Sequence, residues 1–297
     1  MSGSLSGERI VIGHLFPDLL NLYGDRGNIA TLVQRARWRG ALVDVRSIGA
    51  GEAGLIQSAD ILFIGGGQDA QQVEVARGID SLAGALVGAV GRGATLLAVC
   101  GGYQNLGHRF RSGLAGDLTG PGLFDVSTEA PAGATRFVGG VVVELEASSP
   151  IAAVGRPSAT AAGVPGAERQ LVGFENHSGR TRLGAGARPL GRVVIGHGND
   201  DGGSEGSIAL PGEGGLSGLR IGTYLHGPLL PRNPHLADYV IACALAVRGE
   251  IELERLPDDL EWQAHAAFAA RWKAERTSRS GSRVGALADR IGGLVGF

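Results

Sequence analysis

The stretch LLAVCGGYQNLGH, residues 96–108, decides the fold class of this 297-residue chain. Its first four residues are apolar and indicate a buried strand that leads directly into Cys100, Gly101 and Gly102. The two glycines permit a tight backbone turn at the start of a helix. The sequence therefore predicts a strand–turn–helix unit of an α/β fold, with a thiol held on the turn.

Similar apolar runs alternate with helix-like segments before this stretch. The predicted strands span residues 9–15, 41–46, 61–64 and 95–99, and the predicted helices span residues 29–39 and 78–91. Each strand is almost uniformly apolar, which is typical of a parallel sheet covered by helices on both faces. We therefore expect an α/β fold with a doubly wound, mostly parallel sheet.

The chain becomes rich in glycine and turns near residue 113. The β-branched runs 137–145, 170–174 and 192–195 favour a more antiparallel half, before a last strand at 219–225 and a helix at 234–247. We expect residues 1–248 to form one domain and residues 249–297 to form an extension. The extension contains one amphipathic helix, residues 258–276, and a Ser/Arg/Gly-rich stretch that we expect to be mobile.

Composition excludes several classes of protein. The 27 basic residues nearly balance the 29 acidic ones, so we expect no broad cationic surface and no nucleic-acid partner. The two cysteines, Cys100 and Cys243, are far apart, which predicts neither a disulfide framework nor a metal site and favours the reducing cytoplasm. The longest apolar runs are too short to span a bilayer, so we expect no stable membrane insertion.

Cys100 is the candidate nucleophile. A thiol at a strand-to-helix turn lies beside the positive end of the helix dipole, which lowers its pKa and favours the thiolate. The N–H group of Gly101 is then placed to stabilise an oxyanion, as the residue after the nucleophile does in hydrolase elbows. The alternative is a cysteine that merely fills the core, which is the commoner role of an arbitrary cysteine.

The stretch ILFIGGGQD, residues 61–69, is a second strand that ends in glycines. Successive glycines expose backbone N–H groups, so Gly66 and Gly67 are candidates to complete an oxyanion hole. A phosphate-binding loop is the rival interpretation, but the G-x-x-x-x-G-K-[ST] pattern is missing. A simple turn remains open as the plain alternative.

The stretch GTYLHGPLLPRNP, residues 222–234, carries the candidate base, His226. Histidine is the usual base for a catalytic thiol, and the two groups need to meet only in the folded protein. His226 is preferred because it ends a strand, as Cys100 does. Six other histidines compete with it: His14, His108, His177, His197, His235 and His265.

Together the three stretches resemble the class I glutamine amidotransferases, the triad-type family with a flavodoxin-like core. The resemblance covers roughly residues 9–247. It implies that Cys100 attacks the side-chain amide of L-glutamine and that Gly66 and Gly67 belong to the oxyanion hole. It also implies that Gln104, four residues after the cysteine, helps to hold the substrate.

The chain departs from most of that family at Pro228. Most members have a glutamate there, two residues after the catalytic histidine, and the departure is seen in the branch similar to the glutaminase domains of cobyric acid and cobyrinic acid diamide synthases. An imidazole without its orienting carboxylate is a poorer base, because its tautomer and position are less fixed. Glu175, Asp238 or an acid from a partner chain are candidates for that role.

Within this branch the chain is similar to GatD-like glutaminase subunits of lipid II isoglutaminyl synthases. The stretches HLFPDLLNLYGDRGNI, TRFVGG and GFENHSGRT, which begin at residues 14, 135 and 173, carry this resemblance. It implies that Arg136 binds the substrate carboxylate, whereas the plain alternative is a surface ion pair. Asp25 and Asn28 are interpreted as helix caps or as part of the site.

The resemblance also implies a partner and its cofactors. GatD-like subunits supply ammonia to a Mur-ligase-like subunit, MurT, which uses ATP to amidate the D-glutamate of lipid II. We therefore expect no cofactor in this chain, and ATP with Mg²⁺ on the partner. Three alternatives stay open: a subunit for a cobyrinate-like synthetase, a cysteine hydrolase or peptidase with another substrate, and a non-catalytic regulatory or scaffold subunit.

Overall fold

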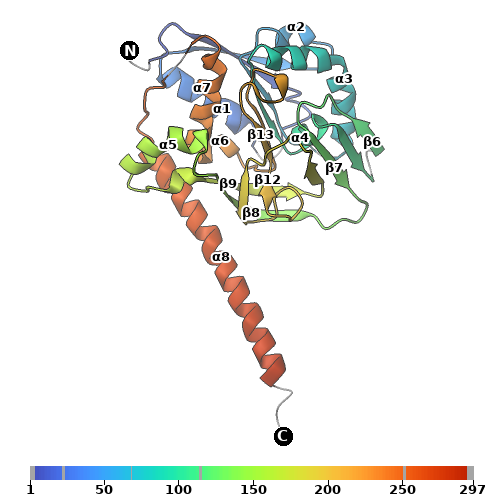
Figure 1. Ribbon diagram of the computed structural model, residues 1–297, viewed down its shortest axis with the longest axis vertical. Helices are drawn as coiled ribbons and strands as arrows, with labels where there is room; N and C mark the ends of the chain where they lie inside the picture. Colours follow the sequence, from blue (N-terminus) through green and yellow to red (C-terminus); the bar gives the residue numbers. More distant parts are fainter. Residues whose placement is uncertain (1–3, 22–23, 68, 114–115, 250–251, 293–297) are drawn as a thin grey trace.

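The computed structural model describes the chain except residues 1–3, 22–23, 68, 114–115, 250–251 and 293–297, and it gives residues 69–70 and 277–292 by their backbone alone. The described chain forms one six-stranded sheet and two four-stranded sheets. Helices flank the central sheet, and one long helix leaves the body of the molecule (Figure 1).

The central sheet has the strand order of a flavodoxin-like fold. Five strands run parallel, in the order β2 (Leu42–Ile48), β1 (Arg9–Leu15), β3 (Ile61–Ile64), β4 (Thr95–Val99) and β14 (Arg220–Thr223). The short strand β13 (Ser207–Ala209) pairs antiparallel with β14 at one edge. The structure confirms the predicted mostly parallel sheet, whose strands were located to within two residues.

Helices cover both faces of this sheet. Helices α1 (Arg26–Trp38) and α7 (Pro234–Ala246) pack together on one side, and α2 (Ala53–Ile56) and α3 (Asp69–Gly91) lie together on the other (Figure 1). Helix α3 begins nine residues before the predicted start at residue 78.

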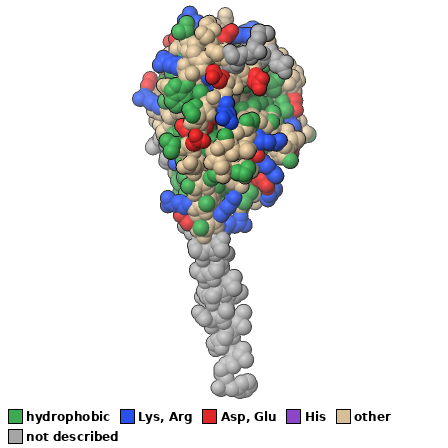
Figure 2. Space-filling view, turned by 90° about the vertical axis from the view of Figure 1, so that its left-hand side faces the viewer, with side chains coloured by type: hydrophobic (Ala, Val, Ile, Leu, Met, Phe, Trp, Pro, Cys, Tyr) green, Lys and Arg blue, Asp and Glu red, His purple; other side chains and the backbone are tan. Residues whose placement is uncertain are grey.

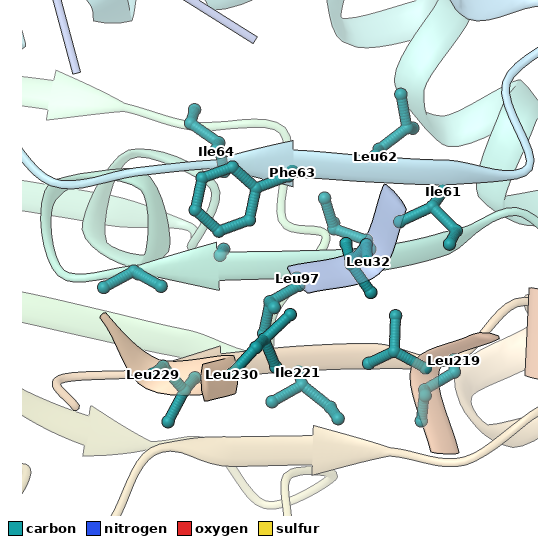
Figure 3. Packing of buried hydrophobic residues seen from close by; sticks show 14 of the residues in the cluster. Leu32, Ile61, Leu62, Phe63, Ile64, Leu97, Leu219, Ile221, Leu229 and Leu230 are labelled. Atoms are coloured by element: carbon teal, nitrogen blue, oxygen red, sulfur yellow. The ribbon is translucent and has the colours of Figure 1, made fainter. Parts of the chain in front are cut away.

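Alternating side chains of the central strands fill the core between sheet and helices. In β3, Ile61 and Phe63 point to the side occupied by Leu32 of α1, while Leu62 and Ile64 point to the opposite side (Figure 3). The short helix α6 (Leu229–Arg232) adds two buried leucines to the same core (Figure 3). Full burial of such a side chain stabilises the fold by about 1.5–3 kcal/mol, so α6 is firmly anchored just after His226.

The two smaller sheets are mostly antiparallel, as the sequence predicts. One contains, in order, β10 (Arg180–Leu183), β7 (Val126–Ala130), β5 (Arg109–Ser112) and β6 (Gly116–Thr119), of which β5 and β7 are parallel. The other contains β12 (Ser204–Glu205), β11 (Gly191–Ile195), β8 (Phe137–Glu144) and β9 (Gln170–His177), all antiparallel. The short helices α4 (Gly101–Asn105) and α5 (Pro150–Ala161) lie outside these sheets.

A buried ion network ties the C-terminal extension to the main body. Arg35 of α1 donates to Asp238 of α7 at 2.7 Å and to Asp258 at 2.6 and 2.8 Å, and Arg39 donates to Asp238 at 2.8 and 2.9 Å. Trp262, on the first turn of α8 (Asp259–Gly292), is fully buried. These contacts cross the boundary predicted at residue 248.

Helix α8 is longer than predicted. Its first part packs on the sheet that contains β8 and β9, and its second part projects away from the body (Figure 1). The predicted helix was to end at residue 276, whereas α8 continues to Gly292; the remainder of the predicted tail lies outside the described residues.

One face of the molecule shows how charged side chains are distributed. Acidic and basic side chains are interspersed on the face that Figure 2 draws, and no broad cationic area is seen there. Within the described part of the chain, no helix combines the length and the apolar character needed to cross a bilayer.

Candidate active site

The ends of β3, β4 and β14 bring three segments to one edge of the central sheet. Parallel pairing places the last residues of these strands side by side. Doubly wound sheets bind their ligands at the carboxyl ends of parallel strands. Gly66, Cys100 and His226 follow these three strands, so the structure gathers residues that are far apart in the sequence.

Cys100 occupies a strained turn between β4 and α4. Its φ angle is +49°, in a region that L-residues rarely adopt, and its amide donates to the carbonyl oxygen of Thr223 at 2.8 Å. The amide of Gly102 donates to the carbonyl oxygen of Gly65 at 3.0 Å. Helix α4 has five residues, so its dipole is weak compared with that of a longer helix.

The absence of a side chain at Gly66 lets the imidazole and the thiol approach each other. A Cβ atom on Gly66 would lie 2.6 Å from Cε1 of His226 and 3.3 Å from Cβ of Cys100. His226 is fully buried, and its backbone pairs with that of Phe174 through hydrogen bonds of 2.7 and 3.1 Å. The two candidate catalytic side chains therefore flank the same glycine.

Burial keeps the His226 ring neutral. Burial, with smaller Coulomb contributions from His177 and Arg136, lowers the pKa of His226 to about 3. A neutral imidazole can accept a proton from the thiol, but the imidazolium that results is unfavourable in this environment.

Both carboxylates that the sequence suggested as orienting acids are engaged elsewhere. Asp238 binds the guanidinium groups of Arg35 and Arg39. Glu175 is buried and accepts from the amides of His197 at 2.9 Å and of Gly198 at 3.0 Å.

The three candidate oxyanion donors differ in availability. The amide of Gly66 donates to Oδ2 of Asp25 at 2.7 Å, so this N–H group is not free for an oxyanion and the interpretation of Gly66 as a donor needs correction. The amide nitrogen of Gly67 lies 3.3 Å from the point that a Cβ atom on Gly101 would occupy. Gly101 opens α4, where first-turn amides have no partner within the helix. Gly67 and Gly101 are therefore the remaining candidate donors.

Gln104 lies on α4, and its backbone amide donates to the carbonyl oxygen of Cys100 at 3.0 Å. Its Nε2 donates to the hydroxyl of Tyr224 at 3.0 Å, and that hydroxyl lies 2.6 Å from Oγ1 of Thr181. Its Oε1 is buried and has no hydrogen-bond partner in the described part of the chain, which suits a group that awaits a donor from a ligand. A Cβ atom on Gly179 would lie 2.4 Å from Gln104 Nε2. The backbone of the GFENHSGRT stretch therefore packs closely against the Gln104 side chain at this glycine.

Arg136 precedes β8 and is exposed. Its guanidinium donates to Oδ1 of Asn176 and, at 3.1 Å, to the carbonyl oxygen of Asn176. In the described part of the chain no carboxylate forms a salt bridge with it, so the plain alternative of a surface ion pair is not observed. Nε and Nη2 bind Asn176, which leaves the edge formed by Nη1 and Nη2 for a ligand carboxylate.

The comparisons with known proteins agree with this arrangement. Residues 11–234 match the family described as the CobB/CobQ-like glutamine amidotransferase domain. The chain belongs to this family. The predicted glutamine amidotransferase family and its cobyric acid synthase-like branch are therefore confirmed.

Several relatives of this amidotransferase have curated names. The subunit GatD of lipid II isoglutaminyl synthase (glutamine-hydrolyzing) from Staphylococcus aureus (strain N315) is 33% identical over 277 residues, which cover 92% of this chain and 100% of that protein. The subunit of the same name from Streptococcus pneumoniae (strain ATCC BAA-255 / R6) is 32% identical over 79% of this chain and 80% of its own. Cobyric acid synthase from Pelotomaculum thermopropionicum is 36% identical over 47% of this chain and 24% of its own.

Two residues that the sequence suggested as helix caps, Asp25 and Asn28, form hydrogen bonds with distant segments in the structure. Asp25 stands at the N-cap position of α1, but its side chain forms no capping hydrogen bond, so the cap interpretation is wrong for this residue. The buried carboxylate instead accepts from the amide of Gly66, in the loop after β3. The amide oxygen of Asn28 accepts from the amide of Leu230 at 2.8 Å.

Two supporting residues were missed in the sequence. Tyr224 holds Gln104, and Asn176 holds Arg136, each through the contacts given above. Their signal was present, because Tyr224 lies two residues before His226 and Asn176 lies in the GFENHSGRT stretch. Their partners come from distant segments, which local patterns do not identify.

The buried Asp25 predicts a pH-dependent effect on stability. Burial raises the pKa of Asp25 to about 7, opposed in part by the hydrogen bond from Gly66. The native state thus binds the Asp25 proton more tightly than the unfolded chain, and the stability that follows is full below about pH 4 and is lost as the pH rises toward 7. Asp25→Asn removes this loss, so its unfolding temperature relative to wild type should rise between pH 4 and 7 and then level off.

Thermal unfolding at pH 4 to 8.5 measures this difference, and Asp44→Asn is the matched control. The half-buried Asp44 has its pKa lowered by Arg46 and Arg9, so its stabilising effect is lost only as the pH falls below about 4. Between pH 4 and 8.5 the control should therefore differ from wild type by a nearly constant amount. A pH-independent difference between Asp25→Asn and wild type would contradict the prediction.

Proposed function

We propose that this chain is the glutaminase subunit of a lipid II isoglutaminyl synthase, which hydrolyses L-glutamine to glutamate and ammonia for a partner subunit. The proposal rests on Cys100 and His226, which meet at Gly66 in a chain that matches the whole length of the S. aureus GatD subunit. The alternative of a cobyrinate-like synthetase has less support, since the alignment with the cobyric acid synthase named above covers less than half of this chain.

The first half of the reaction forms a thioester. The Cys100 thiolate attacks the δ-carbonyl carbon of glutamine, and the N–H groups of Gly67 and Gly101 stabilise the oxyanion. His226, which has taken the thiol proton, gives it to the departing ammonia. The strained backbone at Cys100 holds the sulfur in place for this attack.

The second half returns the enzyme to its starting state. Water adds to the thioester carbonyl carbon while His226 accepts its proton, and the same donors stabilise the second oxyanion. The C–S bond then breaks, the thiolate recovers its proton from His226, and glutamate leaves. During both halves Arg136 binds the α-carboxylate of the substrate, and Gln104 offers its Oε1 to a substrate donor.

The ammonia is consumed by a partner, which we propose to be a Mur-ligase-like subunit such as MurT. ATP and Mg²⁺ would bind to that partner, and this chain itself would hold no cofactor. The partner would amidate the D-glutamate of lipid II. A carboxylate of the partner that faces His226 would raise the pKa of the imidazole and make it a stronger base, so the isolated subunit should have low glutaminase activity.

The proposal predicts different roles for the two cysteines. Cys100→Ala should abolish glutamate release by the complex with the Mur-ligase-like partner, because the nucleophile is lost. Cys243→Ala is the matched control and should keep wild-type activity, because Cys243 lies half-buried on α7. Enzyme-coupled glutamate detection measures both variants, and equal activity in Cys100→Ala and wild type would refute the proposal.

The same assay separates the alternatives. Ammonia transfer to a cobyrinate-type acceptor instead of lipid II would favour the first alternative. Hydrolysis of other amides or peptides in preference to glutamine would favour a hydrolase or peptidase. No turnover in any mixture would favour a regulatory or scaffold subunit.

Arg136 should govern substrate binding rather than chemistry. Arg136→Ala should raise the KM for glutamine by about 10- to 100-fold, the effect of removing a charge-assisted hydrogen bond worth about 1.5–3 kcal/mol. Arg192→Ala, an exposed arginine paired with Glu144, is the control and should leave KM unchanged. Steady-state kinetics over a range of glutamine concentrations decide the matter, and an unchanged KM in Arg136→Ala would contradict it.

The distal part of α8 should be dispensable for glutaminase chemistry. A chain that ends before Thr277 keeps Trp262, Trp272 and the Asp258 ion pair, which hold the extension on the body. We expect its kcat for glutamine hydrolysis to match that of the full chain, when both are measured with the partner. A large loss of kcat in a truncated protein with unchanged circular dichroism would contradict this expectation.

A further inference from the structure

The GDRGN stretch, residues 24–28, touches two of the loops that form the proposed active site. Asp25 is fully buried, accepts from the amide of Gly66 at 2.7 Å, and lies 3.5 Å from Nδ2 of Asn28. Asn28 is also fully buried and accepts from the amide of Leu230, in the segment just after His226, at 2.8 Å. Two adjacent side chains thus connect the loop after β3 to the loop after β14.

The contact with the loop after β3 is close. A Cβ atom on Gly65 would lie 2.5 Å from Oδ2 of Asp25 and 2.7 Å from the carbonyl oxygen of Leu20. Because the Gly66 amide is bound to Asp25, the peptide plane between Gly65 and Gly66 is fixed. The direction of the next amide, that of Gly67, depends on this plane.

The contact with the loop after β14 is also close. A Cβ atom on Gly27 would lie 2.7 Å from Cγ and 2.9 Å from Cβ of Pro228, so only a glycine fits against this proline. Pro228 stands where most class I amidotransferases carry a glutamate. The GDRGN stretch therefore packs on the position at which the usual orienting acid is missing.

We propose that Asp25 and Asn28 form a brace that sets the position of the Gly67 amide relative to His226. We call this pair the Asp25–Asn28 brace. Its members are positioning residues, since the contacts that carry the brace are made to backbone amides of the two loops. The inference rests on the proposed glutaminase function and adds residues to its site.

The brace acts as a hydrogen-bond acceptor toward the Gly65–Gly67 loop. A carboxylate or a side-chain amide oxygen at residue 25 can accept the Gly66 N–H group, whereas a methyl group cannot. Without the acceptor the Gly65–Gly66 peptide is released and the Gly67 amide loses its direction. Loss of one oxyanion donor costs about 100- to 1000-fold in kcat, and a displaced donor costs part of that.

Kinetics of the complex with the Mur-ligase-like partner test the brace. Asp25→Ala should lower kcat for glutamine hydrolysis by about 10- to 100-fold and change KM by less than about 3-fold, since the loop orients a transition-state contact. Asp25→Asn, which keeps an acceptor oxygen, should retain kcat to within about 3-fold. Asn28→Ala should also lower kcat, and the double variant should lose no more than the worse single variant, because the two residues act as a unit.

Asp60→Ala is the matched control. Asp60 likewise accepts a hydrogen bond from a backbone amide, that of Val11 at 2.7 Å. It directly precedes β3, so it lies at the end of this strand opposite to Gly66. This variant should lose stability and keep kcat. Wild-type kcat in Asp25→Ala, an Asp25→Asn variant as impaired as Asp25→Ala, or additive losses in the double variant would each overturn the brace.

Hydrogen–deuterium exchange tests the brace without turnover. Asp25→Ala should speed exchange in peptides that cover residues 61–67 and 225–230, whereas Asp60→Ala should leave the second peptide protected. Unchanged exchange in both peptides of Asp25→Ala would overturn the inference. A wild-type complex without glutaminase activity that still shows the exchange pattern would refute the proposed function and keep the brace.

Discussion

The site depends on a missing side chain at residue 66. His226 Cε1 and Cys100 Cβ both come within 3.3 Å of the point that a Cβ atom would occupy there. Real Cβ atoms essentially never approach other heavy atoms to 2.6 Å, so any other residue would push the imidazole away from the thiol. The arrangement of the three strand ends, and the chemistry proposed for them, therefore requires glycine at this position.

Burial determines which proton states the site can reach. The low pKa of His226 follows mainly from the removal of water and secondarily from nearby positive charge. The carboxylate of Glu175 already binds backbone amides, and that of Asp238 already binds arginines. Burial in this chain thus disfavours the imidazolium that forms when His226 takes the thiol proton.

Local sequence patterns predicted the parallel strands and the turn at Cys100. Apolar runs of strand length located the parallel strands, and the Cys-Gly-Gly junction located the turn at Cys100, because each depends on neighbouring residues. Asp25 shows that a contact with a distant segment is not predicted by such patterns. A residue of that type before a helix is usually a cap, and its actual partner, Gly66, is 41 positions away. The length of α8 escaped prediction for another reason, since Gly and Ser in its second half favour loops on intrinsic propensity.

A glutaminase that lacks its own orienting acid has a physical advantage when it works for a partner. Ammonia released without an acceptor is lost, so hydrolysis is useful when the synthetase is docked. Here the fold keeps the imidazole neutral and places proline where a carboxylate would stand, so the chain alone pays the full cost of forming a buried ion pair. One carboxylate brought by a partner would offset much of that cost through Coulomb attraction in a site of low dielectric constant. If a partner supplies that carboxylate, coupling of hydrolysis to assembly needs no conformational change in this chain.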